Sequence, residues 1–292
     1  MHNAYRSGIQ QALVTLSLIV IGLYPRFVQA QTFGGNSWSE TKANGQGTLA
    51  VVSYEIPGMI ETGTDGQPTG VCVEVLNDFV EYVNTNHGVK LRIDYQHREG
   101  DFSRFMAQTR KGDHVLGLTT MSIMKSRQGR MQLTPAYMRN QLVLMTHNSV
   151  PFISSFTDLS RSLKGKTALA VADGNNEEYL RLLQANYYPE MKIEFRASEK
   201  EILKDMAASS EYFSILDFTA YYQVIKKRLP LRRQDVPLER HFQESFGFLL
   251  SDNSDWNPLW EEFLTSSYRT STGYRKAVSD NLGSAFMSFA RP

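Results

Sequence analysis

The sequence contains very little cysteine and carries almost no net charge. Its single cysteine, Cys72, cannot form an intramolecular disulfide, and it lies in a periodic apolar segment where a small buried side chain is expected. The 31 basic side chains are balanced by 30 acidic ones, so no net field attracts nucleic acid or an anionic membrane surface. We therefore expect no nucleic-acid partner, and a small molecule or a specific protein surface as the partner.

The sequence also lacks the spacings that common catalytic and metal sites require. Its 6 histidines are scattered and form neither a His-x-His nor an HExxH pattern, so we expect no metal and no cofactor. No serine lies in a Gly-x-Ser-x-Gly turn, and Cys72 is expected to be buried, so nucleophilic catalysis has no candidate. These absences favour a binding protein without catalytic residues over an enzyme.

The first thirty residues resemble a cleavable secretory signal. Arg6 precedes an apolar run from Ile9 to Leu23, and Val28 and Ala30 place small residues at the −3 and −1 positions before residue 31. The strongly apolar part, residues 12–23, is shorter than the roughly 20 residues that cross a bilayer, which favours cleavage over an uncleaved anchor. We expect residues 1–30 to be a signal peptide and the mature protein to be periplasmic or secreted.

The chain behind this signal divides into segments of different composition. Residues 31–47 are rich in Gly, Ser, Asn and Thr and predict a flexible leader, with the fold beginning at Thr48. From there β-branched runs alternate with helical patterns. The predicted strands are 49–52, 91–95 and 115–118, and the predicted helices are 71–83 and one that Asp101 caps. This alternation is typical of a parallel α/β layer.

The same alternation repeats after an extended apolar run at 141–145. The predicted strands are 167–172, 192–195 and 213–216, the predicted helices are 176–185, 199–208 and 218–227, and a further extended run at 246–250 leads into a terminal helical region. Two α/β units joined by two extended crossings predict two lobes with a hinge near Arg139 and Ser245. We expect lobe 1 to comprise 48–138 plus 247–292 and lobe 2 to comprise 142–244, with the ligand in the cleft at the carboxyl ends of the strands.

Residues 123–137, from Ile-Met-Lys-Ser-Arg to Thr-Pro-Ala-Tyr, carry a resemblance to a known family. The segment resembles, without a gap, the stretch from an "ITPER"-like turn to an "FSDPY"-like ending in the extracellular solute-binding proteins of polar amino acid ABC transporters. Three other pieces follow the family's order, at 65–70, 101–103 and 163–166, and the resemblance covers roughly residues 48–283.

This resemblance implies an α/β, two-lobed periplasmic-binding-protein-like (type II) fold with a two-strand hinge. It further implies a monomer that captures a small-molecule ligand, an amino acid or a related carboxylate, by lobe closure. The captured ligand would be delivered to the membrane permease of an ABC transporter.

The resemblance assigns charged roles to two residues. Arg127 falls on the family's arginine and would hold the ligand's α-carboxylate through its planar fork, with Ser122 and Thr120 beside it. Asp217 matches an acid that would pair with an α-ammonium group, and it is equally suited to cap the helix that follows. Arg127 and Asp217 on different lobes would meet the two ends of a zwitterion, so the ligand would stabilise the closed state.

The resemblance places four more residues at the ligand, each with an ordinary structural alternative. Asn175 and Asn176 match a turn whose backbone amides point into the cleft, or they simply start a helix. Phe102 matches an aromatic side chain that stacks on the ligand, although its spacing to the next apolar residues also fits a core position. Tyr54 follows the first strand and is placed to form the floor of the cleft.

Departures from the family pattern leave three alternatives open. Met124 stands where a threonine is usual, Tyr54-Glu55 replaces a longer loop with an aspartate, and Ala172 or Asp173 replaces a lysine. The alternatives are a cleft enzyme similar to cyclohexadienyl dehydratase with Glu55 as general acid, a ligand-sensing accessory protein, and a cleft that no longer closes on an amino acid. Carboxylate recognition is therefore better supported than the identity of the amino acid.

Overall fold

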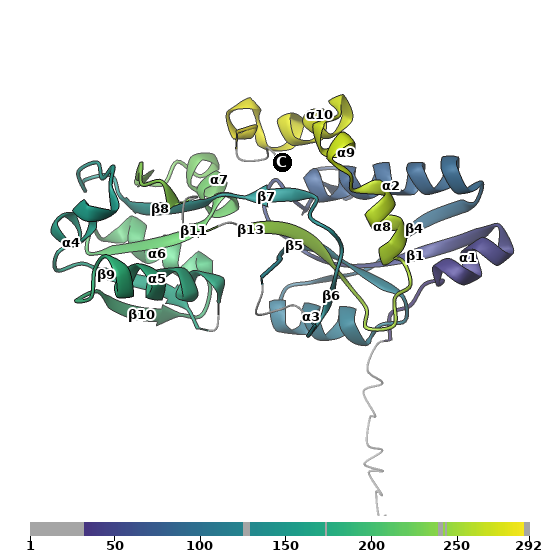
Figure 1. Ribbon diagram of the computed structural model, residues 1–292, viewed down its shortest axis with the longest axis horizontal. Helices are drawn as coiled ribbons and strands as arrows, with labels where there is room; N and C mark the ends of the chain where they lie inside the picture. The colour runs from purple at the N-terminus through teal and green to yellow at the C-terminus, as the bar shows by residue number, and fades with distance from the viewer. Residues whose placement is uncertain (1–31, 125–128, 173, 239–241, 243, 289–292) are drawn as a thin grey trace, which may run out of the picture. The chain divides into compact units, whose positions relative to one another are not determined.

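The computed structural model describes residues 32–124, 129–172, 174–238, 242 and 244–288. Within these residues the strands form two main sheets and one short two-stranded ladder (Figure 1). Among the helices of this part of the chain, none combines the length and the apolar character needed to cross a bilayer. The predicted signal peptide, residues 1–30, lies outside the described residues.

The first sheet has the strand order β4-β1-β5-β13-β6, with β7 also paired to β13. Its strands are β1 (Gln46–Tyr54), β4 (Lys90–Glu99), β5 (Val115–Ser122), β6 (Gln132–Leu133), β7 (Met138–Asn140) and β13 (Glu244–Leu250). Strands β1, β4 and β5 are parallel, and the helices α2 (Val71–His87) and α3 (Phe102–Lys111) connect them. Their carboxyl ends therefore lie along one edge of the sheet.

The second sheet has the strand order β10-β9-β11-β8-β12. Its strands are β8 (Leu142–His147), β9 (Thr167–Val171), β10 (Lys192–Arg196), β11 (Tyr212–Asp217) and β12 (Leu231–Arg233). Strands β9, β10 and β11 are parallel, and each is followed by a helix: α5 (Asn175–Asn186), α6 (Glu199–Ala208) or α7 (Phe218–Lys226). The starts of these three helices share the carboxyl edge of the sheet.

Alternation along the strands supplies both faces of each sheet with core residues. In β1, Leu49 and Val51 belong to one hydrophobic cluster, whereas Ala50 and Val52 belong to another on the opposite face. The larger cluster contains side chains from both sheets, and the rings of Phe218 and Phe246 lie 5.9 Å apart within it. The two sheets therefore share part of one core.

The segments that connect the two sheets lie beside each other. Strand β7 pairs antiparallel with β13, where Asn140 stands opposite Glu244, and only Gln141 separates β7 from β8 of the second sheet. The chain leaves the first sheet through β7 and returns to it at β13. This arrangement is a two-strand hinge.

Most of the predicted strands and helices are confirmed, but the predicted flexible leader is wrong. Residues 38–44 form a helix, α1 (Trp38–Asn44), in which Ser37 and Glu40 make a capping box. The first backbone amides of α1 also donate to Asp255, with nitrogen–oxygen distances of 2.6 Å from Trp38 and 2.9 Å from Ser39. The Ser-x-x-Glu spacing was a helix signal within a polar composition, and the fold begins ahead of Thr48.

Several smaller elements were not predicted. They are β2 (Glu61–Thr62), β3 (Pro68–Thr69), α4 (Leu159–Ser162), β6, β7 and β12. These unpredicted elements are short, so their sequences show too little periodicity to be recognised.

The predicted terminal helical region consists of α8 (Asn257–Phe263), α9 (Ser266–Thr270) and α10 (Thr272–Leu282).

Candidate functional site

The carboxyl edges of the two sheets meet at Asn175, the first residue of α5. Its side-chain nitrogen Nδ2 donates to Ser122 Oγ at 3.2 Å and to Glu244 Oε1 at 3.1 Å. Ser122 ends β5 and Glu244 begins β13, so both acceptors belong to the first sheet. The side chain of Asn175, at the start of the helix that follows β9, therefore links the second lobe to the end of β5 and to the start of β13.

Glu244 is the most enclosed carboxylate at this junction, with 3% of its surface exposed. It accepts hydrogen bonds from the side-chain amides of Asn140 and Asn175. Burial raises the pKa of Glu244, while hydrogen bonds from Ser122, Asn175 and Asn140 lower it and the charge of Asp217 raises it, with a net upward shift. The carboxylate is thus satisfied by neutral donors and is not neutralised by a cation among them.

Asp217 ends β11 and caps α7. Its Oδ1 accepts from the backbone amides of Thr219 and Ala220, both at 3.1 Å, and from Thr219 Oγ1 at 2.5 Å. Burial raises the pKa of Asp217, and these hydrogen bonds oppose the shift only in part. The capping role foreseen from the sequence is confirmed, and the same carboxyl group lies at the edge where Asn175 and Glu244 meet.

Glu199, the first residue of α6, completes an acidic group that the sequence did not reveal. Burial, and after it the negative charges of Asp217 and Glu244, raise the pKa of Glu199 to about 8. None of these three carboxylates forms an ion pair with a basic side chain within the described ranges. Three acids therefore share one edge without a described counter-charge.

Two aromatic side chains lie at the carboxyl edge of the first sheet. Tyr54 ends β1 and Phe102 begins α3, and their ring centroids are 5.3 Å apart in an edge-on contact. Phe102 packs on Phe105 at 6.0 Å and still exposes 38% of its surface, so it combines the core role with an accessible face. Burial, and then the charges of Glu199 and Asp101, raise the pKa of Tyr54, which places this ring within the electrostatic reach of Glu199.

The remaining residues foreseen from the sequence fall into separate places. Asn176 is buried, and its Oδ1 accepts a hydrogen bond from the backbone amide of Val171 at 3.2 Å. This side chain therefore stabilises the turn between β9 and α5. Thr120 is buried within β5, two residues before Ser122. Arg127 lies outside the described residues, and so does Asp173.

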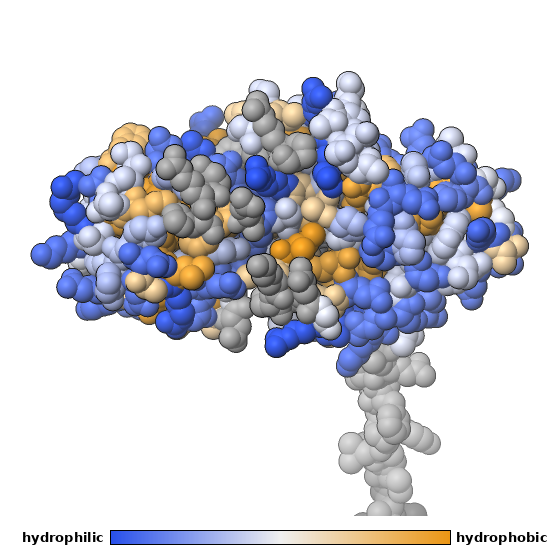
Figure 2. All heavy atoms as spheres, viewed as in Figure 1, coloured by the Kyte–Doolittle hydropathy of each residue, from blue (hydrophilic) through white to orange (hydrophobic). Residues whose placement is uncertain are grey.

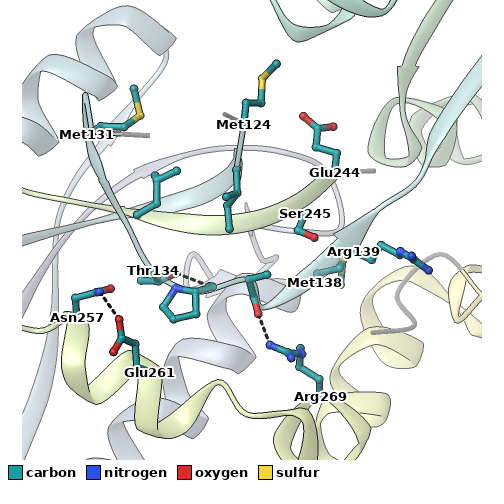
Figure 3. A pocket seen from close by; sticks show the side chains of 15 residues that line it. Met124, Met131, Thr134, Met138, Arg139, Glu244, Ser245, Asn257, Glu261 and Arg269 are labelled. Atoms are coloured by element: carbon teal, nitrogen blue, oxygen red, sulfur yellow. Dashed lines mark hydrogen bonds between the residues drawn. The ribbon is translucent and has the colours of Figure 1, made fainter. Parts of the chain in front are cut away.

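A pocket of about 780 Å³ adjoins this junction on the side of the first sheet. Its lining includes Ile123, Met124, Met131, Met138 and Glu244. Figure 2 shows hydrophobic side chains gathered around β5 and β13, and Figure 3 shows Arg139 directed away from the carboxylate of Glu244. The volume is in the range of small-molecule pockets, so Glu244 borders both this pocket and the acidic edge.

Sequence reasoning missed Glu199, Glu244 and Asn140 for different reasons. Glu199 had a signal, because Ser198 and Glu201 form a Ser-x-x-Glu helix start directly after a predicted strand, at the edge that also carries Asp217. Asn140 and Glu244 had none, because they lie 104 positions apart and meet only through the pairing of β7 with β13.

The architecture defines a class of fold. Two mixed α/β sheets, joined by a two-strand hinge and meeting at their carboxyl edges, form the two-lobed type II periplasmic-binding-protein fold that the sequence predicted. No protein-family profile matches the chain, and no curated protein matches it in sequence.

Several solved structures share the fold of this chain, among them substrate-binding proteins of ABC transporters. One, from Streptococcus pneumoniae with bound histidine, has a TM-score of 0.61 and 18% identity over 84% of this chain and 95% of its own. A second, from Streptococcus pneumoniae bound to L-arginine, has a TM-score of 0.60 and 15% identity over 87% and 100%. An ancestral arginine-binding protein bound to glutamine has a TM-score of 0.58 and 16% identity over 81% and 98%. At these identities the likeness concerns the fold.

Proposed function

We propose that this protein is an extracytoplasmic solute-binding protein that captures an amino acid between its two lobes. It acts as a monomer, performs no chemistry on its ligand, and delivers the ligand to the permease of an ABC transporter. The observation that carries this proposal is the double hydrogen bond of Asn175 to Ser122 and Glu244, which brings the two carboxyl edges together beside Asp217. Neighbours of the same fold hold histidine, arginine and glutamine, which supports an amino acid as the ligand class.

The proposed binding mode uses one charged group from each lobe. Asp217 Oδ1 is already engaged with α7, and its second carboxylate oxygen is the acceptor for the ligand's α-ammonium group. Arg127, with Ser122 and Thr120 beside it, holds the α-carboxylate from the first lobe. The ligand then contributes contacts that exist only when the lobes are closed, so binding and closure are coupled.

A thermal-shift screen tests this proposal. The purified full chain is heated with each common amino acid, with polyamines and with small organic acids, because a ligand that binds only the folded state raises the unfolding midpoint. We expect a concentration-dependent rise with one or a few amino acids. A flat response across the whole panel would refute amino acid capture.

Arg127→Ala tests the carboxylate contact. Loss of a charge-assisted hydrogen bond should weaken amino acid binding by roughly 1.5 to 3 kcal/mol and leave folding nearly unchanged. Isothermal titration with the amino acid found in the screen measures the loss, and circular dichroism checks the fold. Arg130→Ala is a matched control at an exposed arginine three positions further along. Equal affinities for the wild type and Arg127→Ala would remove Arg127 from the site.

One observation favours a second candidate function, a cleft enzyme that uses a general acid. Glu199, with its pKa of about 8, keeps a proton at neutral pH, as a general acid must. Glu55 does not fit this role: burial raises its pKa, but hydrogen bonds from Thr62 and Arg98 outweigh that and lower it. Incubation with cyclic carboxylic acids that can lose water, followed by product analysis, separates the two functions, and turnover that Glu199→Gln abolishes would establish the enzyme.

A further inference from the structure

The acidic edge holds more carboxyl groups than one amino acid's ammonium group requires. Glu199 begins α6, Asp217 ends β11 and Glu244 begins β13. Among the described residues, the charges that act on Glu199 are those of Asp217 and Glu244, and both are negative. If Asp217 accepts an α-ammonium group, two carboxylates remain at the same edge without a partner of opposite sign among the described residues.

A metal ion is a poor match for these additional carboxyl groups. The described part of the chain contains no group of three or more His, Cys, Asp or Glu side chains arranged to hold a metal ion. Glu199, Asp217 and Glu244 therefore do not form such a group, although the charges of Asp217 and Glu244 act on Glu199. A partner with cationic centres separated by a carbon chain suits such spacing better than a monatomic ion.

A buried polar atom beside Glu244 independently indicates a missing donor. Asn140 is 3% exposed, and its Nδ2 is held by Glu244, so its amide lies against this carboxylate. Its Oδ1 is buried and has no hydrogen-bond partner among the described residues. Because buried acceptors in native proteins are nearly always satisfied, this oxygen is available to accept an N–H group.

The aromatic pair on the first sheet is suited to the rest of such a ligand. Tyr54 lies within the electrostatic reach of Glu199, and Phe102, in contact with Tyr54, keeps an exposed face. Aromatic faces attract ammonium and guanidinium groups and also cover the aliphatic chain that carries them. The edge thus offers carboxylates on one side and aromatic rings on the other.

We infer that the cleft selects an organic cation with a second amine or guanidinium group: Asp217 holds one cationic centre, and Glu199, Glu244 and the free amide oxygen of Asn140 receive the other. A basic amino acid and a polyamine share this chemistry. The inference rests on the proposed ligand capture and specifies its ligand class. Glu199 and Glu244 are then the residues that determine specificity.

Isothermal titration of the full chain with arginine, lysine, glutamine, glutamate and putrescine tests the inference. We expect arginine or lysine to bind at least about tenfold more tightly than glutamine, the ratio that one charge-assisted hydrogen bond provides. Glu199→Gln should weaken arginine binding by about tenfold and change glutamine binding by less than about twofold. Glu178→Gln is the matched control, because it makes the same charge change at an exposed position in the first turn of α5 and should leave both affinities unchanged.

Proton release provides a readout that a merely structural role would not change. Within the part of the chain that the structure describes, the titratable groups facing Glu199 are Asp217 on β11, Glu244 on β13 and Tyr54 on β1. A cationic ligand requires the ionised form of Glu199, so arginine binding at pH 7 should release about one proton in the wild type. In Glu199→Gln it should release almost none. Titrations in buffers of different ionisation enthalpy measure this number.

The outcomes separate the inference from the proposed function. Glutamine bound as tightly as arginine and lysine would overturn the cation preference while amino acid capture stands. Putrescine bound without any amino acid would support the cation preference and overturn amino acid capture. An equal loss of arginine and glutamine affinity in Glu199→Gln, without a change in proton release, would overturn the role of Glu199.

Discussion

The carboxyl edges of the two sheets carry glutamates in similar positions and opposite electrostatic environments. Glu99 ends β4 in the first sheet, where hydrogen bonds from Arg104 and the backbone amide of Asp101 lower its pKa to about 2. Glu199 follows β10 in the second sheet, where burial and two neighbouring acids raise its pKa to about 8. The same residue type at the same kind of strand end is therefore ionised in one sheet and protonated in the other at neutral pH.

This difference shows how structural acids can be distinguished from candidate functional ones. Glu99 receives its donors from the start of its own helix and from a neighbouring arginine, so its charge is compensated within the first lobe. Glu199 has no such donors among the described residues, and uncompensated burial costs stability. Buried ionisable groups without compensating donors are expected at functional sites, where ligand binding takes precedence over stability.

Glu199→Gln should produce the largest effect on the free energy of unfolding. It removes the buried ionisable group that distinguishes the second sheet from the first in this comparison. The pKa of Glu199 is raised above its ordinary value of 4.5, so the stability that the group contributes is present below pH 4.5 and is lost as pH rises toward 8. The variant should be more stable than the wild type at pH 8, on the order of a few kcal/mol, and nearly equal to it at pH 4.5. Urea unfolding at both pH values measures the difference, with Glu178→Gln as control. An advantage of equal size at both pH values would contradict the charge argument.

Substitution of Asp217 sharpens the comparison by separating the cap of α7 from the charge. Asp217→Ala should lower the free energy of unfolding by about 1 kcal/mol, whereas Asp217→Asn, which still caps, should change it by only a few tenths. Asp217→Asn should nevertheless weaken amine-bearing ligands more than simple carboxylates. Urea unfolding and calorimetric titration give the two numbers. Equal weakening of both ligand types would restrict Asp217 to capping.

Glu99→Gln should have the smallest effect on the neutral-pH protein. Its partner Arg104 is 68% exposed, so water screens the ion pair, and Gln can still accept from the backbone amides. The lowered pKa of Glu99 gives stability that is present above pH 4.5 and lost as pH falls toward 2. The variant should therefore unfold in acid with a shallower pH dependence than the wild type. An identical acid-unfolding curve would show that the pair contributes no stability.

Most of the fold could be predicted from the sequence, because each strand and helix shows its own periodic pattern of apolar and polar residues. The strand and helix series of both lobes follows from periods of about 2 and 3.6 residues, and Asp101 and Asp217 are caps that the sequence itself indicates. The residues of the candidate site could be predicted only where they lie at the start of a predicted helix, as Asn175 and Asp217 do. Glu244 and Asn140 depend on a pairing between distant strands, which no local pattern encodes.

The core that both sheets share has a consequence for how the protein unfolds. Leu216 and Phe218 of the second sheet belong to the same buried cluster as Phe246 and Phe248 of the first. Neither half can unfold without exposing apolar surface of the other, so differential scanning calorimetry should record one cooperative transition, with equal calorimetric and van't Hoff enthalpies. A fragment limited to residues 142–238 would lack part of its own core and should aggregate or remain expanded when produced alone.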